Sequence, residues 1–221
     1  MHSDKLLEAA LNVDYQQSLT PVVSSFVENA AICYGLDPAG ALDLTLSAEE
    51  IFTYLCSLGD HNEKVKISCR YGAYFVELEF QFKSDDFDLT AFNLTACHTL
   101  SCEEQSFQTG LLIASRLVDR FSFFRKGGVS MLLMVKERPY SRIKEEEPLQ
   151  TKILGDLIIR RPDPEEIKLF VRKSLRNYDA CVTPLSFETP GKVVDMEAGG
   201  KYSIAIATDM AGTIGGGIVW T

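Results

Sequence analysis

The sequence predicts an α+β two-layer sandwich in which helices cover one face of a mixed, mostly antiparallel sheet, followed by a second, partial α/β domain. Apolar residues recur at helical spacing in the first quarter of the chain, and apolar and polar residues then alternate in two separate strand pairs. From residue 138 to 152 the composition changes to prolines and a run of charges, which is typical of a linker between domains.

The composition of the 221 residues is that of a globular protein and argues against several classes of function. Apolar residues make up 46% and charged residues 24%, so disorder, collagen and coiled coil are poor interpretations. A net charge of −9 argues against a nucleic-acid partner. No stretch approaches the roughly 18 apolar residues of a membrane helix, and the first residues lack a signal-peptide core. We therefore expect a cytoplasmic protein without a membrane partner.

Two helices are expected before the first strand. Apolar positions at helical spacing predict a helix over residues 15–34. In the second helix, Asp37 is a natural N-cap and Pro38 a natural first residue, and the apolar stripe stops at Gly59.

A strand pair follows over residues 64–82, turned around Tyr71 and Gly72. Its second strand alternates, which predicts one buried face and one wetter face. The buried face should carry Tyr74, Val76, Leu78, Phe80 and Phe82.

Residues 84–108 are polar and irregular, and a loop of this length is usually a lid or a binding segment. The next helix, residues 109–120, is expected to direct four apolar side chains inward: Leu112, Ile113, Leu117 and Val118. A second hairpin over residues 121–136 should turn at Gly127 and Gly128.

The last part of the chain predicts a strand at 156–160, a helix at 161–175, an irregular stretch and a strand pair at 202–220. A final strand without a partner suggests an incomplete domain. The expected domains are residues 1–137 and 153–221, joined by a linker at 138–152.

Three segments in order resemble a known family: "LTLSAEEIFTYLCSLGD" (44–60), "VELEFQFKSDDFD" (76–88) and "FQTGLLIASRLVDRFSFFRKGGVSMLLMVK" (107–136). They are similar to the landmarks of the histidine-kinase-like (GHKL) ATPase domain, and most closely to bacterial anti-sigma-factor serine kinases. The third segment is the most specific. The resemblance implies a Bergerat-type fold for the first domain, with ATP and Mg²⁺ as the family's cofactors.

The resemblance also implies roles for single residues. Glu50 falls on the general base, which takes a proton from a substrate hydroxyl or positions water. Tyr54 falls on the asparagine that holds Mg²⁺, and a neutral phenol is a poor ligand for that cation. Phe82 falls near the aspartate that accepts the adenine amino group, and a phenyl ring accepts nothing.

The glycine positions near the nucleotide have changed as well. Ser84 and Asp86 occupy positions where glycine lets the backbone approach the ligand, and of the second glycine box only Gly110 remains. Because these changes act on one ligand, the pattern favours a scaffold that is kept and a nucleotide site that is lost.

The segments "LIIRRPDPEEIKLFVRKSLRNY" (157–178) and "YSIAIATDMAGTIGGGIVW" (202–220) resemble the opening of the GNAT acetyltransferase fold. The family's acetyl-CoA cradle follows these elements. No acetyl-CoA site is therefore expected within this chain.

Plain structural interpretations remain open for several of these residues. Glu49 fits a solvated helix edge. Glu50 and Tyr54, four residues apart, fit a structural hydrogen bond. The soft ligands His61, Cys97, His98 and Cys102 have no known zinc spacing, so no metal site is expected. The stretch "AGTIGGG" precedes a strand, which favours a turn over a phosphate cradle.

The leading hypothesis is a regulatory interaction module whose degenerate ATPase-like domain binds a protein partner and is coupled to an acetyltransferase-like domain. By resemblance, the partner is a sigma factor or its antagonist, and homodimers are common in the family. The alternative is an active ATP-dependent serine kinase with Glu50 as base. A third hypothesis places a small ligand in the former nucleotide pocket, beside Tyr54 and Phe82.

Overall fold

The computed structural model describes residues 7–58, 63–83, 87, 102–143, 156–178 and 182–221. The chain divides into two compact units, Met1–Pro139 and Tyr140–Thr221, and each has a hydrophobic core of its own. The families suggested for the two domains, and their exact limits, stay predictions. Among the described residues, no helix is long and apolar enough to cross a membrane.

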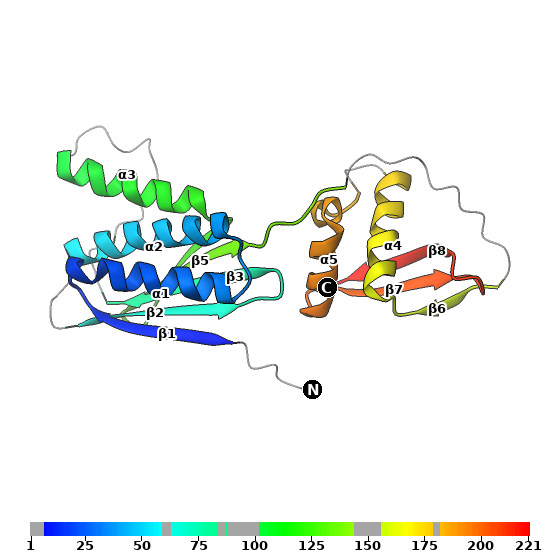
Figure 1. Cartoon of the computed structure of the whole chain (residues 1–221), viewed down its shortest axis with the longest axis horizontal. Coiled ribbons are helices and arrows are strands. Elements are labelled where there is room, and N and C mark those ends of the chain that lie inside the picture. The colour runs from blue at the N-terminus through cyan, green and yellow to red at the C-terminus, as the bar shows by residue number, and fades with distance from the viewer. Residues whose placement is uncertain (1–6, 59–62, 84–86, 88–101, 144–155, 179–181) are drawn as a thin grey trace. The chain divides into compact units, whose positions relative to one another are not determined.

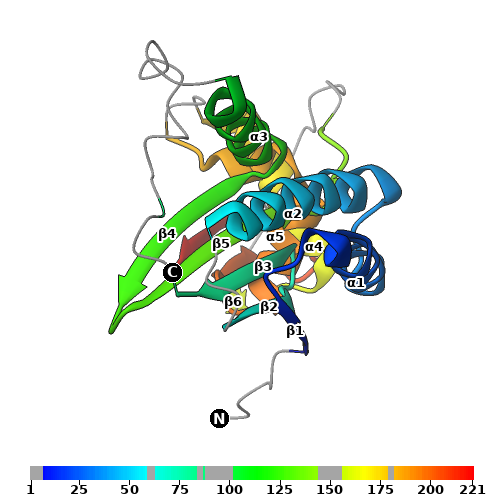
Figure 2. The same cartoon turned by 90° about the vertical axis from the view of Figure 1, so that its left-hand side faces the viewer.

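The first unit is a layer of helices on one face of a five-stranded sheet (Figures 1 and 2). Its elements are β1 (Glu8–Asp14), a short 3-10 turn η1 (Gln17–Leu19), α1 (Thr20–Cys33), α2 (Pro38–Leu58), β2 (Lys64–Tyr71), β3 (Phe75–Phe82), α3 (Cys102–Leu117), β4 (Arg120–Lys126) and β5 (Val129–Glu137). The predicted first helix is therefore η1 followed by α1.

The sheet has the strand order β1-β2-β3-β5-β4, and every described pair of neighbours is antiparallel. The prediction of a mixed sheet was wrong in this respect. Strand β1 was not predicted; exposed and less exposed side chains alternate along it, but Val13 is its only buried side chain. It pairs with the whole length of β2 and forms one edge of the sheet.

Helix α2 forms as its sequence predicts. The Asp37 carboxylate accepts a hydrogen bond from the Gly40 N–H at 2.9 Å, which satisfies one of the free donors in the first turn. Pro38 is the first residue of the helix and Leu58 the last. The predicted apolar stripe lies in the core of the unit, where its large side chains are fully buried: Leu44, Ile51, Phe52 and Leu55.

The hairpin of β2 and β3 also follows its sequence pattern. All five expected side chains of the buried face, from Tyr74 to Phe82, are less than 9% exposed. The opposite face carries an ionic cluster in which the Arg70 guanidinium donates to Glu77 and to Glu79, each at 2.9 Å. This face is polar, as expected, and is organised around one arginine.

Two predictions around α3 were wrong. The helix begins at Cys102, so the last part of the expected loop 84–108 is helical. Ile113 is 48% exposed, whereas Leu111 and Ala114 are fully buried. The β4–β5 hairpin turns at Gly127 and Gly128 as predicted, and both have positive φ (+60° and +78°), which glycine adopts without strain.

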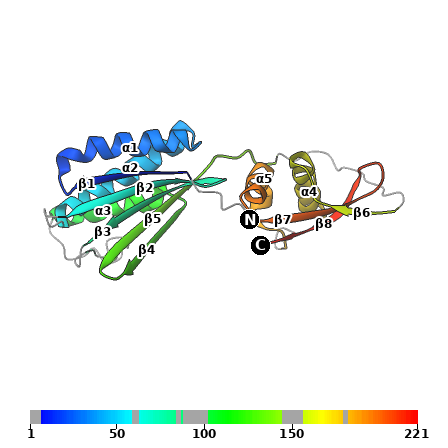
Figure 3. The same cartoon turned by 90° about the horizontal axis from the view of Figure 1, so that it is seen from below.

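In the second unit, two helices lie on one face of a three-stranded antiparallel sheet of order β6-β7-β8 (Figure 3). The elements are β6 (Ile158–Arg160), α4 (Pro164–Asn177), a 3-10 turn η4 (Leu185–Glu188), α5 (Pro190–Ala198), β7 (Ser203–Thr208) and β8 (Ile214–Trp220). Asp163 and Glu166 form a reciprocal capping box at the start of α4. Helix α5 lies in the stretch that was expected to be irregular.

Candidate functional site

Two of the residues singled out by the resemblance face each other across neighbouring helices. Glu50 is an exposed residue of α2, and Gly110 is a buried residue of α3. A Cβ atom placed on Gly110 would collide with the Glu50 carboxylate, so this carboxylate lies directly over the glycine backbone. The predicted base and the remaining glycine therefore share one place in the fold.

Polar contacts hold α2 and α3 together beyond this point. The buried Ser47 hydroxyl lies 3.1 Å from the carbonyl oxygen of Ala114 and 2.8 Å from that of Asp43. Further along, the Lys136 ammonium on β5 donates to the Asp43 carboxylate and to the Leu117 carbonyl, both at 2.7 Å. The lysine ties the sheet to both helices and so fixes the distance between them.

The other two described positions, Tyr54 and Phe82, belong to an aromatic cluster in the core. We define this aromatic cluster as Tyr54, Phe82, Phe87 and Phe123. The Phe87 ring stacks on Phe123 with ring centroids 4.9 Å apart and an interplanar angle of 8°. It also contacts Phe82 at 5.0 Å and the edge of Tyr54 at 5.6 Å.

The aromatic cluster is shielded from water. Tyr54 is 9% exposed, Phe82 2% and Phe87 7%, and Phe123 packs partly buried against the same core. Tyr54 and Phe82 both contribute ring surface to the core of the first unit.

Several predicted positions lie outside the described residues. They are Ser84 and Asp86, the histidines and cysteine His61, Cys97 and His98, and the side chain of Cys102. Within the residues that the structure describes, no group of three His, Cys, Asp or Glu side chains is placed to hold a metal ion.

Glu49 is more than a solvated residue at the helix edge. It is half-buried between α1 and α2, and its carboxylate accepts a hydrogen bond of 2.5 Å from the Ser24 hydroxyl. The contact of Glu49 joins two helices and is structural. Of the two neighbouring glutamates, Glu50 is therefore the one that faces α3.

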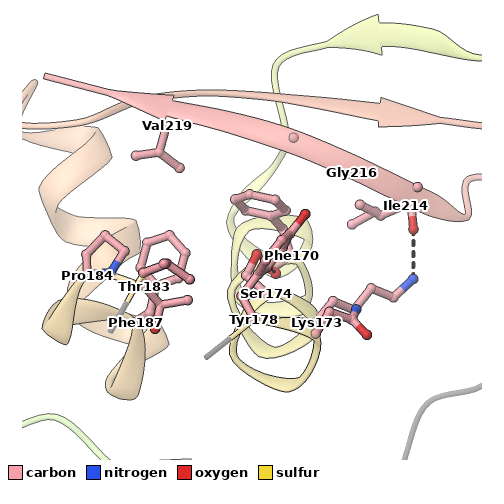
Figure 4. A pocket seen from close by; sticks show the side chains of 14 residues that line it. Phe170, Lys173, Ser174, Tyr178, Thr183, Pro184, Phe187, Ile214, Gly216 and Val219 are labelled. Carbon is pink, nitrogen blue, oxygen red and sulfur yellow. Dashed lines mark hydrogen bonds between the residues drawn. The ribbon is translucent and has the colours of Figure 1, made fainter. Parts of the chain in front are cut away.

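A second candidate site is a pocket of about 690 Å³ in the second unit, between α4, η4 and β8 (Figure 4). Phe170, Phe187 and Val219 form its apolar part. Lys173 lies at its margin and donates a 2.9 Å hydrogen bond to the Ile214 carbonyl. Partial burial lowers the pKa of Lys173, and the attraction of Asp209 opposes this effect.

The glycine run of β8 forms the wall of this pocket. A Cβ atom on Gly217 would lie 2.7 Å from the Ala205 carbonyl oxygen and 2.8 Å from the Phe170 ring, so only glycine allows α4 to pack this closely. The preceding turn is closed by the Asp209 carboxylate, which accepts from the N–H groups of Ala211 and Thr213. The "AGTIGGG" stretch is thus a turn and a strand, as predicted.

Sequence reasoning missed Phe87, Phe123 and the pocket of the second unit. Phe87 follows no periodic pattern, because it stands alone among the polar residues of the stretch KSDDFD (83–88). The only available signal was the number of phenylalanines near the two hairpins, and this signal does not tell which rings meet.

No family model and no curated protein matches the sequence. Sixteen chains of solved structures are similar in fold, among them one from the crystal structure of the SiaB-SiaC complex of Pseudomonas aeruginosa. That chain aligns with a TM-score of 0.42 and 15% identity over 59% of this chain and 89% of its own length. A likeness at this level carries no argument about function.

Proposed function

We propose that the first unit is a regulatory domain that binds a protein partner and does not turn over ATP. The observation that supports this proposal is the aromatic cluster, because it contains Tyr54 and Phe82, the two positions that by resemblance correspond to the metal ligand and the base anchor. By resemblance, the partner is a sigma factor or its antagonist, and the second unit is an acetyltransferase-like domain coupled to the first.

The physical chemistry of the aromatic cluster opposes nucleotide binding. A nucleotide in this place would have to displace the rings of Tyr54, Phe82 and Phe87, which are at most 9% exposed, and it would then face a phenyl ring instead of a carboxylate. A buried polar group without a partner costs about 1–3 kcal/mol, and the adenine amino group and the metal would each lack a partner here. Together these two losses, about 2–6 kcal/mol, would remove a large part of the roughly 8 kcal/mol of an ordinary micromolar affinity.

The helix layer supports a role in protein binding. Five large apolar side chains of α1, α2 and α3 are 40–54% exposed: Val22, Ile32, Leu42, Leu46 and Ile113. Contiguous exposed apolar side chains mark sites where another protein docks, and Leu42 and Leu46, four residues apart in α2, lie on the same face of that helix. The partner surface that we expect is therefore the outer side of the helices.

Calorimetric titration of the whole chain with ATP, with and without Mg²⁺ and up to millimolar concentrations, tests the loss of the nucleotide site. We expect no saturable heat. The active serine kinase with Glu50 as base would be favoured by saturable binding that requires Mg²⁺. Such binding should also be lost in Glu50→Ala and persist in Glu28→Ala. Glu28 is a suitable control because it is an exposed glutamate of α1.

Association with a partner needs a separate measurement. Purified sigma factors and their antagonists, added one at a time, should shift the chain in size-exclusion chromatography. The substitution Leu46→Asp should weaken that association at a limited cost in stability, because Leu46 is 40% exposed, and a melting curve of the variant checks that it stays folded. Association that Leu46→Asp and Leu42→Asp both leave unchanged would argue against a docking role for the helix layer.

A further inference from the structure

The second unit contains a pocket of about 470 Å³ that lies apart from the one between α4 and β8. Three segments form its walls: residues 141–143, the side of α4 that carries Lys168 and Arg172, and the start of α5 at Pro190 and Gly191. Its volume is in the range of pockets that bind small molecules.

Two hydrogen bonds hold the wall of residues 141–143 in place. The Tyr140 hydroxyl donates to the Asp195 carboxylate of α5 at 2.5 Å, and the Ile143 N–H donates to the Glu188 carbonyl at 3.1 Å. A Cβ atom on Gly191 would lie 3.2 Å from the Tyr140 ring, so the glycine permits this close approach. The segment is thus part of a built pocket, with Arg142 in its lining.

The pocket gathers positive charge in a chain whose net charge is −9. Its lining includes three cationic side chains, Arg142, Lys168 and Arg172. Among the described residues, Arg172 has no ion pair, and the nearest acidic partner of Arg142, Glu188, is 3.9 Å away.

The existing ion pairs are weak competitors for an anion. Lys168 pairs with Glu165 at 2.7 Å, but the glutamate side chain is 80% exposed, and an exposed pair of this kind contributes little to stability. A bound anion can therefore replace these partners at small cost. The start of α5 adds to the field, because Thr189 provides no side-chain cap and the positive end of the helix dipole lies at Gly191.

We propose that this pocket binds the phosphate group of a small organic phosphate. Two guanidinium groups favour a tetrahedral oxyanion, because each can donate two parallel hydrogen bonds to its oxygens. The ammonium of Lys168 adds a third positive charge that suits a dianion. The site is independent of the function proposed for the first unit, and it uses none of the residues of the aromatic cluster.

The test is calorimetric titration of the whole chain with pyrophosphate and with glycerol 3-phosphate. We expect saturable binding that weakens as salt is added. Arg172→Ala should raise the dissociation constant by about tenfold or more, since it removes a charged hydrogen-bond donor. The control Arg161→Ala removes an exposed arginine outside the pocket and should change the dissociation constant less than about twofold.

Several outcomes would overturn this assignment. They are the absence of saturable binding at millimolar concentrations of either compound, equal weakening by the two variants, and binding of a phosphoserine peptide without binding of the free phosphates. Arg172 is exposed, so the variant should keep its fold. An unfolding transition, detected by Trp220 fluorescence, at the same denaturant concentration as in the unchanged protein would verify this.

Discussion

The aromatic cluster makes a quantitative prediction through Phe87, whose ring contacts the other three members. The substitution Phe87→Ala removes a ring that is 7% exposed. An aromatic side chain of this kind buries about 200 Å², which at about 25 cal/mol per Å² is an upper limit of about 5 kcal/mol. Alanine keeps part of this area, so we expect a loss of about 3–4 kcal/mol in the free energy of unfolding of the first unit.

Denaturation by guanidinium chloride separates the two units by their signals. The single tryptophan, Trp220, lies in β8 and reports on the second unit alone, whereas circular dichroism also follows the helices of the first. Phe87→Ala should lower the midpoint of the first unit by about 1 M and leave the transition detected by Trp220 unchanged. The control Phe124→Ala removes a 54% exposed ring from β4 and should cost less than about 1 kcal/mol.

Two results would refute this reasoning. If Phe87→Ala destabilises the first unit no more than Phe124→Ala, the ring is not part of the core. If Phe87→Ala gains saturable, Mg²⁺-dependent ATP binding, the rings only block a nucleotide site that is otherwise intact. We expect no such gain, because opening the cavity restores neither the metal ligand at Tyr54 nor the base anchor at Phe82.

Three further predictions concern single residues. Gly217→Ala should destabilise the second unit by about 1–3 kcal/mol, because the new Cβ would meet a carbonyl of β7 and a ring of α4. A Cβ on Gly216 meets no atom, so the control Gly216→Ala should be nearly neutral when unfolding is followed by tryptophan fluorescence. Burial raises the pKa of the Cys69 thiol to about 12, so iodoacetamide should alkylate the exposed Cys33 and leave Cys69 unmodified until the protein unfolds. Peptide mass spectrometry measures both reactions, and equal rates of alkylation would contradict the burial of Cys69. Hydrogen bonds from its arginine partner and a backbone N–H hold the pKa of Glu166 at about 2, below the ordinary 4.5, so this carboxylate stabilises the second unit above pH 4.5 and loses its effect as the pH falls toward 2. Glu166→Gln should flatten the dependence of unfolding on pH in that range, and an unchanged profile would show that the contact does not contribute.

Elements with strong local signals were predictable from the sequence. Helix α2 has a cap, a proline at its first position and a continuous apolar stripe, and the β2–β3 hairpin has strict alternation. Strand β1 and helix α5 lack such signals: Val13 is the only buried residue of the first, and the second has nine residues with Gly191 in its first turn. Strand β1 depends on its pairing with β2, which is distant in the sequence, whereas α5 packs against α4 and η4, which precede it in the chain.

The candidate site was predictable to a different extent at each residue. The pairing of Glu50 with Gly110 follows from the resemblance, because the motif places α2 and α3 side by side. The role of Phe87 could not be predicted, since a single residue without a periodic pattern has no local sign of burial. The substitutions at Tyr54 and Phe82 predicted the loss of polar contacts, but the ring that packs between them becomes evident only in three dimensions.

Gly110 has a structural explanation that requires no nucleotide. A glycine inside a helix costs about 0.5–1 kcal/mol relative to alanine, so some contact must justify its presence in α3. The Glu50 carboxylate occupies the space that a Cβ would take, and the buried Ser47 hydroxyl bonds the Ala114 carbonyl one turn further along. Both contacts depend on a close approach of α2 and α3, and the glycine permits this approach. The residue that most resembles a nucleotide-binding motif is therefore also one whose lack of a side chain leaves room for the present position of the Glu50 carboxylate.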